Sequence, residues 1–394
     1  MLRDRKKMRV PIVAFAVTLF SLLSTADLTL AAKKVIKIGN IDPYTGPAAA
    51  LGLGMRNSID LHIRQANASG KFPDYDIQLV ALDDASDPAT GVAMATKLGS
   101  DQDVIGVSAH YNSPVALATV HIFHRFGLAN VMSCAVHPDI IRGNDYKEIT
   151  RIIADIPAEQ AFGGDFVTGR YGYKNWSVVH DTTAWGKSRF DWFKKDLESR
   201  PGTKILSVDG VTTGTKDFRP LLTKIKGLKA DAIFAGLVIQ EAALLKMQMH
   251  ELGMDHILFY GTTGIDSETF NEIAGKAAEG AIIIGQPYVS PDSDFAKAYA
   301  AAGYKEPYEA YGPFAYDATG IILEGLSKFG PNRKAIVDYV ADPAFEYNGV
   351  TGYIKLKNRQ TKTGGLRMKV SQDGKWVPFE KSEYFTGKRK LSGK

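Results

Sequence analysis

Short apolar runs alternate with stretches of helical periodicity along most of the chain, and this alternation limits the folds that the chain can adopt. In the first part, runs typical of strands occupy residues 35–39, 77–82, 104–107 and 128–132. Between them, apolar residues recur at helical spacing in residues 55–66, after Asp87-Pro88 and in residues 114–126. Apolar strands that alternate with helices are typical of a parallel sheet with helices on both faces.

The same pattern starts again in the second part of the chain. Strands are predicted at residues 176–180, 205–208, 232–234, 257–259 and 281–284, with a helix over residues 186–198 after the first of them. Two successive α/β units of similar length predict two lobes.

The last third departs from a simple second copy. Residues 313–329 predict an apolar helix, and residues 353–356 and 375–377 predict late antiparallel strands. We therefore expect the chain to cross between the lobes more than once. The segment after Glu380 is basic and polar, which predicts a solvated, partly disordered end.

The N-terminal segment has the layout of a secretory signal peptide. A basic stretch at residues 3–9 precedes the apolar run 10–23, and small and polar residues follow up to Ala31 and Ala32. The apolar run is shorter than the ~20 residues that span a bilayer, so a membrane anchor is the less favoured alternative. We predict that residues 1–32 are a signal peptide and that the protein is exported.

Cysteine content and charge exclude several classes of protein. Cys134 is the only cysteine, so no disulfide forms within the chain, and no cysteine follows the apolar run to carry a lipid anchor. The formal charge is +5, but the first 31 residues hold five basic and two acidic residues, which leaves +2 for the rest. That balance is too near neutral for a nucleic-acid-binding surface.

The motifs that suggest a cofactor are incomplete. Gly52-Leu53-Gly54 follows a predicted strand, but the third glycine of a dinucleotide-binding motif is replaced by Asn57. We interpret these glycines as a flexible loop that passes close to a ligand or a neighbouring lobe. Asp83-Asp84, at the end of a strand, is interpreted as a pair of cap and loop residues.

Histidines leave a metal-dependent enzyme as a minor alternative. His121 and His124 are three residues apart on a predicted helix, with His110 and His137 in flanking segments. We favour surface or hydrogen-bonded histidines, and we predict neither a cofactor nor a metal nor catalysis.

The loops that follow the predicted strands are rich in hydroxyl, amide and aromatic groups. In an open parallel sheet, ligands bind beyond the carboxyl ends of the strands. A helix that begins at Pro114 would direct free N–H groups and a positive dipole end at an anion beside Ser113. Trp185 and Tyr44 are candidates to close over an apolar ligand, with core packing as the alternative for each.

Several short motifs follow one another in a characteristic order. They are Thr45-Gly46-Pro47 with Gly52, Asp83-Asp84 with Asp87-Pro88, His110-Tyr111-Asn112-Ser113, His180-Asp181 before Trp185-Gly186, Lys216-Asp217-Phe218, Ala278-Glu279-Gly280 and Tyr316-Asp317-Ala318. In these motifs the chain resembles the periplasmic solute-binding proteins of the branched-chain-amino-acid type that serve ABC transporters. The resemblance covers nearly the whole chain after the N-terminal segment.

This resemblance implies a type I periplasmic-binding fold, which is an α/β fold of two doubly wound parallel-sheet lobes with a hinge of three crossovers. We expect residues 33–155 plus about 286–345 to form lobe 1. Residues 156–285 plus about 346–380 would form lobe 2, and residues 381–394 a basic C-terminal tail.

Carried over by position, the resemblance also implies a ligand site. Ser113, beside Asn112, corresponds to the serine whose hydroxyl binds the ligand carboxylate. Ala135 and Val136 correspond to a loop that supplies backbone donors, and Val136 lacks the hydroxyl of the usual threonine. Trp185 corresponds to the aromatic residue that the second lobe lays against the ligand.

Other positions depart from the family pattern. Leu51 and Val238 stand where relatives can place large aromatic residues. Thr263 stands where amino-acid binders place the acid that pairs with the α-ammonium group. Burying an ammonium without a partner is costly, so this departure argues against a zwitterionic ligand. Asp266, three residues later, is the alternative acid.

The expected function is therefore that of a periplasmic receptor of an ABC importer. It would capture a small apolar or aromatic carboxylate, or an amino acid, by lobe closure and deliver it to the permease subunits. We expect a monomer that needs no cofactor. A binding protein that presents its ligand to a separate sensory receptor is the alternative, with the exported metal-dependent enzyme less favoured.

Overall fold

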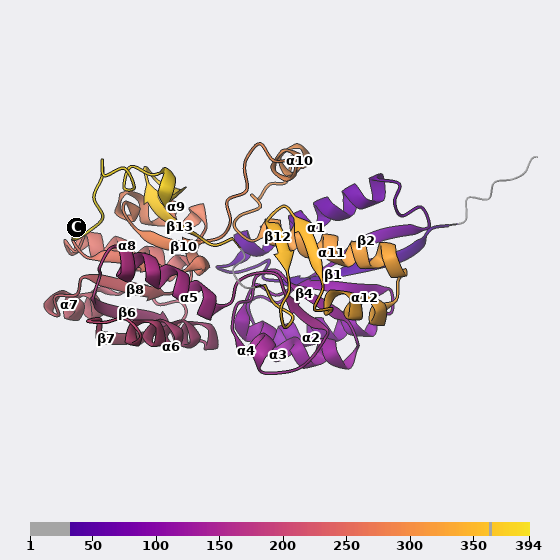
Figure 1. Cartoon of the computed structure of the whole chain (residues 1–394), viewed down its shortest axis with the longest axis horizontal. Helices are drawn as coiled ribbons and strands as arrows, with labels where there is room; N and C mark the ends of the chain where they lie inside the picture. Colours follow the sequence, from indigo (N-terminus) through magenta and orange to yellow (C-terminus); the bar gives the residue numbers. More distant parts are fainter. Residues whose placement is uncertain (1–31, 362–364) are drawn as a thin grey trace, which may run out of the picture. The chain divides into compact units, whose positions relative to one another are not determined.

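The computed structural model describes residues 32–361 and 365–394, and residues 34–394 form one compact unit. The predicted signal peptide lies outside the described residues except for Ala32. The described residues contain two large sheets, with helices on both faces of each, and one small hairpin (Figure 1). Within these two ranges, no helix has both the length and the apolar character that crossing a bilayer requires.

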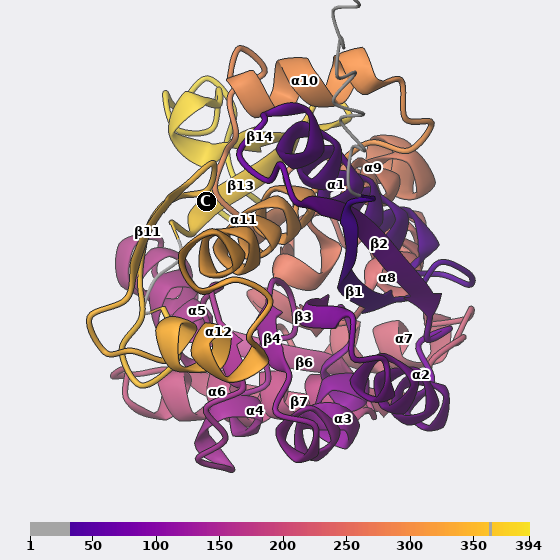
Figure 2. The same ribbon diagram turned by 90° about the vertical axis from the view of Figure 1, so that its right-hand side faces the viewer.

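The first sheet is parallel throughout and has the strand order β2-β1-β3-β4-β5. Its strands are β1 (Lys34–Asp42), β2 (Tyr75–Asp83), β3 (Val104–Ala109), β4 (Ala129–Met132) and β5 (Ile149–Arg151). One face is covered by α1 (Ala49–Ala68), α11 (Gly312–Phe329) and α12 (Arg333–Val340). The other face is covered by α2 (Pro88–Ser100) and α3 (Ser113–Arg125), next to the short helix α4 (Asp139–Arg142) (Figure 2).

The second sheet is mixed and has the strand order β14-β13-β10-β9-β8-β6-β7. The parallel strands are β6 (Asn175–Asp181), β7 (Lys204–Val211), β8 (Ala232–Gly236), β9 (Leu258–Gly261) and β10 (Ile282–Gly285). The edge strands β13 (Arg367–Gln372) and β14 (Lys375–Pro378) are antiparallel.

Helices cover both faces of the second sheet as well. On one face lie α5 (Ile156–Gly164), the π-helical turn η1 (Asp165–Arg170) and α6 (Ala184–Glu198). On the other lie α7 (Arg219–Gly227), α8 (Ile239–Glu251) and α9 (Glu268–Ala274). Three short 3₁₀ turns complete this part, η2 (Thr263–Ile265), η3 (Gly275–Ala278) and η4 (Phe379–Lys381).

The chain passes between the two sheets after β5, after β10 and again before β13, so the predicted two-lobed α/β fold with three crossovers is confirmed. The segment between β10 and β13, which returns to the first sheet, contains α10 (Asp294–Ala302). It also contains the hairpin of β11 (Glu346–Gly349) and β12 (Gly352–Lys355). Because β11 packs against α11, the hairpin favours a lobe boundary after residue 355, later than the expected 345/346. The exact lobe boundaries stay a proposal.

Hydrophobic periodicity located most elements correctly, and the late antiparallel strands at residues 353–356 and 375–377 were found as β12 and β14. The strands β5, β11 and β13 were not predicted. β5 has only three residues, β11 has only four, and four of the six residues of β13 are polar or charged, so none of them has a clear apolar signal.

The predicted loop at Gly52 and Gly54 is wrong, because both glycines lie inside helix α1. A Cβ added to Gly52 would lie 1.9 Å from the carbonyl oxygen of Pro43, and one added to Gly54 would lie 2.5 Å from that of Pro307. The two glycines therefore allow α1 to pack against backbone, which is the reason for their spacing.

The C-terminal segment also differs from the solvated end that its composition predicts. Tyr384 and Leu391 are buried against the core of the second sheet, at 9% and 5% exposure. Arg389 pairs with Glu279 at 2.7 Å and with Asp373 at 2.9 Å. Arg389 thus holds this segment to acidic side chains in loops at the edge of the second sheet.

Candidate functional site

A cavity of about 170 Å³ lies where loops that follow the parallel strands of both sheets meet. From the first sheet and its helices, the lining residues are Pro47, Ala48, Ser86, Tyr111, Asn112, Ser113, Pro114, Cys134, Val136 and Tyr311. From the second they are Asp181, Thr183, Trp185, Arg189, Thr213, Val238, Ile239, Gln240 and Gly264. The carboxyl ends of parallel strands are the usual ligand sites of open α/β sheets.

Ser113 is placed to bind an anion. It is the first residue of the 13-residue helix α3, and its side chain is almost completely buried, at 2% exposure. Its Oγ accepts a hydrogen bond from the backbone N–H of His137 at 3.2 Å, which leaves the hydroxyl proton free to donate. A helix N-terminus supplies unpaired N–H groups and a positive dipole end, so this corner suits a carboxylate.

The loop after β4 lies opposite Ser113 and is held by a buried arginine. Arg151 donates from Nη1 to the carbonyl oxygens of His137 at 2.8 Å and Ala135 at 3.4 Å. Its Nη2 donates to Gln360 at 2.6 Å and lies 3.6 Å from Asp155. Burial lowers the pKa of Arg151 to about 10, and the guanidinium remains charged at neutral pH.

Aromatic and aliphatic side chains make up the walls. Tyr111 and Tyr311 meet edge to face with ring centres 5.8 Å apart. The Tyr311 hydroxyl donates to the backbone carbonyl of Thr263 at 2.6 Å and so joins the two parts of the site. With Val136, Val238 and Ile239 also in the lining, the cavity suits a ligand with an apolar body.

A buried ion pair forms part of the cavity wall on the side of the second sheet. Arg189 lines the cavity and donates from Nη1 to Glu159, and both side chains are completely buried. Thr263 Oγ1 lies 3.1 Å from each carboxylate oxygen of Glu159 and accepts from Arg189 Nη2 at 3.0 Å. Burial raises the pKa of Glu159, and the charge of Arg189 opposes that rise.

Asp181 is the second formally charged side chain among the described lining residues. It is the last residue of β6, is buried, and accepts from the backbone N–H of Thr183 at 2.9 Å and from the Thr183 hydroxyl. Burial raises the pKa of Asp181, while the bonds from Thr183 and the backbone of Gly186 oppose the rise. Its carboxyl is thus an acceptor within the cavity wall.

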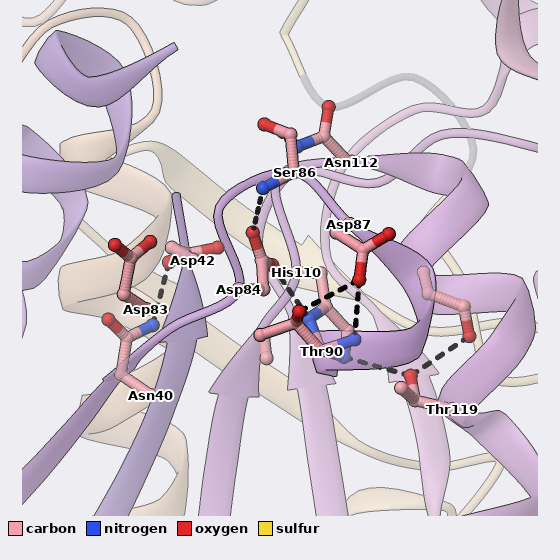
Figure 3. A network of polar contacts seen from close by, with 12 residues as sticks. Asn40, Asp42, Asp83, Asp84, Ser86, Asp87, Thr90, His110, Asn112 and Thr119 are labelled. Atoms are coloured by element: carbon pink, nitrogen blue, oxygen red, sulfur yellow. Dashed lines mark hydrogen bonds and ion pairs between the residues drawn. The ribbon is translucent and has the colours of Figure 1, made fainter. Parts of the chain in front are cut away.

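A polar network supports the Ser113 corner from the first sheet (Figure 3). Asn112 Nδ2 donates to Ser86 Oγ at 2.8 Å, and the Ser86 backbone N–H donates to Asp84 Oδ1 at 2.8 Å. The other oxygen of Asp84 faces His110. Nearby, Asn40 donates to Asp42 at 2.7 Å, and burial raises the pKa of Asp42 well above its usual range.

Five of the ten residues predicted for the ligand site line this cavity: Asn112, Ser113, Val136, Trp185 and Val238. The other five lie outside the lining. Ala135 and Leu51 are buried in the cores on either face of the first sheet. The Tyr44 hydroxyl donates to Asn40 instead.

Thr263, at the position of the missing acid, and Asp266, the alternative acid, are also engaged elsewhere. Thr263 is buried with Glu159 and Arg189. Both Asp266 oxygens accept from Lys369 Nζ at 2.8 Å, and one accepts from the backbone N–H of Gln286. Asp266 therefore links β13 to the residue that follows β10.

Sequence reasoning missed Arg189, Glu159 and Tyr311. Arg189 lies four residues after Trp185 on α6, so helical spacing places both on one face, and that spacing was the available signal. The guanidinium carbon of Arg189 lies 5.0 Å from the centre of the Trp185 ring. Nothing local marks Glu159 or Tyr311, which come from segments distant in the sequence.

The histidines do not converge on a metal. His124 pairs with Glu148 at 2.8 Å and stacks on Tyr146, and His110 contacts Thr119 at 2.8 Å. Within residues 32–361 and 365–394, no group of three or more potential metal ligands is found.

The fold and the cavity define a class of protein: a two-lobed α/β binding protein with a small, largely apolar cavity between strand-end loops. The Periplasmic binding protein family matches residues 35–375, and the chain belongs to this family. It is a periplasmic solute-binding protein of an ABC transporter, and the members of this class are transporter substrate-binding proteins and not enzymes.

Two relatives show the extent of the likeness. The Leu/Ile/Val-binding protein BraC3 of Rhizobium johnstonii is 30% identical over 318 residues, which cover 80% of this chain and 83% of the relative. The leucine-, isoleucine-, valine-, threonine- and alanine-binding protein of Pseudomonas aeruginosa is 29% identical over 356 residues, which cover 90% of this chain and 91% of the relative.

Solved structures share the fold. The substrate-binding protein LivJ of the Streptococcus pneumoniae branched-chain amino acid transporter, in complex with isoleucine, has a TM-score of 0.79 at 24% identity, covering 87% of this chain and 98% of that one. A solute-binding protein of an R. palustris ABC transporter, in complex with 4-hydroxybenzoate, has a TM-score of 0.76 at 21% identity. The match covers 88% of this chain and 95% of that one.

Proposed function

We propose that this chain captures one small apolar carboxylate between its lobes and delivers it chemically unaltered to the permease of an ABC importer. The observation that carries the proposal is the position of Ser113, at the N-terminus of α3 and at one corner of an apolar cavity. A carboxylate there would accept from the Ser113 hydroxyl and from free helix N–H groups.

The size of the cavity favours a compact ligand. A dry cavity of ~150 Å³ is known to admit a benzene ring, and the cavity here measures about 170 Å³. One aromatic ring or a short branched aliphatic chain, together with a carboxylate, is of that size. Trp185, Val136 and Val238 supply the apolar contacts.

The charges favour a ligand without an α-ammonium group. Thr263 replaces the expected acid, and the oxygens of Glu159 are occupied by Arg189 and Thr263. A cation in the cavity would also face the guanidinium of Arg189. An amino acid is the alternative ligand, with Asp181 as its ammonium partner. Similar proteins are named for Leu, Ile and Val binding or were solved with isoleucine or 4-hydroxybenzoate.

Calorimetric titration with matched ligand pairs tests the proposal. The pairs are 4-methylpentanoate against leucine and 3-phenylpropanoate against phenylalanine, with benzoate as a further single-ring acid. We expect the acid without the ammonium group to bind more tightly in each pair. Absence of binding by every acid and amino acid, or tighter binding of both amino acids, contradicts the proposal.

The Ser113→Ala variant tests the anion corner. A hydrogen bond to a charged group contributes about 1.5–3 kcal/mol, so affinity for the bound carboxylate should fall roughly tenfold to a hundredfold. Ser100→Ala, an exposed serine near the end of α2, is the matched control and should leave affinity unchanged.

The same proposal has four further parts. The lobes close on the ligand, and the ligand is delivered to the permease subunits. The protein is a monomer, and residues 1–32 direct its export. Ligand contacts that form only in the closed state would shift the population toward it. Small-angle scattering should show a smaller radius of gyration with the bound acid than without it, at a mass of one chain. An unchanged scattering curve at saturating ligand would argue against capture by closure.

A further inference from the structure

Arg189 has a position that the capture of a carboxylate at Ser113 does not explain. It lies one helical turn after Trp185 on α6, lines the cavity on the side of the second sheet, and is completely buried. Arginine is rarely buried without strong partners, because a buried charge is costly. Glu159 supplies the opposite charge, so the pair is electrically neutral.

The hydrogen bonds of this guanidinium are incomplete. Nη1 donates to Glu159 and Nη2 donates to Thr263 Oγ1, which fixes the plane of the group against the Trp185 ring. The Nε–H of Arg189 is buried and has no acceptor among the described residues. A buried N–H without a partner is unfavourable, so a ligand oxygen that reached it would satisfy an existing deficit.

The charge balance decides which kind of acceptor fits. Because Glu159 already neutralises Arg189, a second carboxylate on the ligand would add an uncompensated negative charge to a buried site. An ammonium group would face the guanidinium and would find the Glu159 oxygens already occupied. A neutral oxygen, such as a hydroxyl or carbonyl, accepts from Nε–H without either penalty.

We propose that Arg189 is a specificity-determining residue that donates from Nε to a neutral oxygen on the ligand, at the end remote from the carboxylate. The substrate class is then the apolar monocarboxylates that carry a hydroxyl or carbonyl group at that end. This inference rests on the proposed function, because it assumes that the carboxylate lies at Ser113. Asp181, also in the lining, would accept a hydrogen bond from a ligand hydroxyl, but as a carboxylate it has no proton to donate to a ligand carbonyl.

Four benzoates of similar size separate the possible contacts. 4-Methylbenzoate has no polar group at the remote end, 4-formylbenzoate has an acceptor only, 4-hydroxybenzoate has a donor and an acceptor, and terephthalate has a second carboxylate. By calorimetry on the full mature chain, we expect the formyl and hydroxyl compounds to bind at least tenfold more tightly than 4-methylbenzoate. Terephthalate should bind more weakly than either.

Two variants test whether Arg189 causes this preference. Arg189→Lys keeps the positive charge but lacks the Nε–H and the planar group. Arg189→Met combined with Glu159→Gln removes the ion pair while it leaves no uncompensated charge. In both we expect the preference for 4-formylbenzoate over 4-methylbenzoate to disappear, while 4-methylbenzoate still binds. Arg142→Gln, a half-exposed arginine outside the cavity lining, is the matched control and should keep the preference.

The outcomes distinguish this inference from the proposed function. If no benzoate and no other carboxylate binds, the proposed function fails. If carboxylates bind but 4-formylbenzoate gains nothing over 4-methylbenzoate, or the gain survives in Arg189→Lys, the inference about Arg189 is wrong while the proposed function stands. Should the double variant not fold, the wild-type ligand series and Arg189→Lys still decide.

Discussion

The Nδ1 atom of His110 lies 3.5 Å from the Asp84 carboxylate, with both side chains completely buried (Figure 3). Thr119 Oγ1 donates to the carbonyl oxygen of Ala116 at 3.1 Å and lies 2.8 Å from His110 Nε2. The two ring nitrogens of His110 thus face different groups, Nδ1 the Asp84 carboxylate and Nε2 the Thr119 hydroxyl. The pair lies beneath the loop that carries Asn112 and Ser113 to the cavity.

Separating this pair should destabilise the protein strongly. Removing one partner of a buried pair leaves the other without compensation, which costs about 3–5 kcal/mol. We expect Asp84→Asn and His110→Gln each to lower the free energy of unfolding by that order, measured by urea denaturation. The double variant should lose less than the sum of the two, because the residues are coupled. Additive losses would show that the contact contributes nothing, and Asp292→Asn, at an exposed position, is the control.

His62 predicts a pH dependence of stability. Its Nδ1 lies 2.8 Å from the Tyr316 carbonyl, its ring stacks on Tyr316, and burial lowers the pKa of His62 to about 4. Between pH 4 and 6.5 the unfolded chain binds a proton here that the folded chain does not, so this residue makes stability rise with pH. The contribution is up to about 3 kcal/mol, is complete above pH 6.5, and is lost as the pH falls toward 4.

Denaturation of the wild type and His62→Gln at pH values between 4 and 7 measures this contribution. The difference in unfolding free energy between the two proteins should change with pH in this window. A difference that stays constant from pH 4 to 7 would contradict the assignment to His62.

Arg151 should matter for ligand binding although it lies outside the cavity lining. It holds the carbonyl groups of Ala135 and His137, and His137 in turn donates its N–H to Ser113. We expect Arg151→Met to weaken carboxylate binding at least tenfold and to lower stability, as measured by calorimetry and urea denaturation. The partly exposed Arg142 pairs with the same Asp155, and Arg142→Gln should cost no more than about 1 kcal/mol. Equal effects of the two variants would refute a specific role for Arg151.

Gly52 should not tolerate a side chain. A Cβ there would lie 1.9 Å from the Pro43 carbonyl oxygen, so Gly52→Ala forces the backbone of α1 away from β1. We expect a loss of about 1–3 kcal/mol in unfolding free energy. Gly227, in α7, has no atom within 4 Å of an added Cβ, and Gly227→Ala should be neutral or stabilise by up to about 1 kcal/mol. If both substitutions stabilise the protein, the close contact with Pro43 does not explain the glycine at position 52.

Local patterns in the sequence determined the layered α/β architecture, the two lobes and the position of Ser113 at the start of a helix. These properties depend on hydrophobic periodicity, prolines and strand-end loops, which act over a few residues. The same reasoning failed for Gly52, because the reason for that glycine is the backbone of Pro43 against α1 and not a loop.

Only the tertiary structure decided which further side chains line the cavity. Glu159 and Thr263 are 104 residues apart, yet both contact Arg189, and these contacts place a buried, neutral ion pair beside Thr263. The packing of Leu391 against the second sheet was equally hidden behind a basic, polar composition. Contacts between distant segments depend on how whole lobes pack. The residue pattern of a single segment therefore does not predict which other segments it contacts.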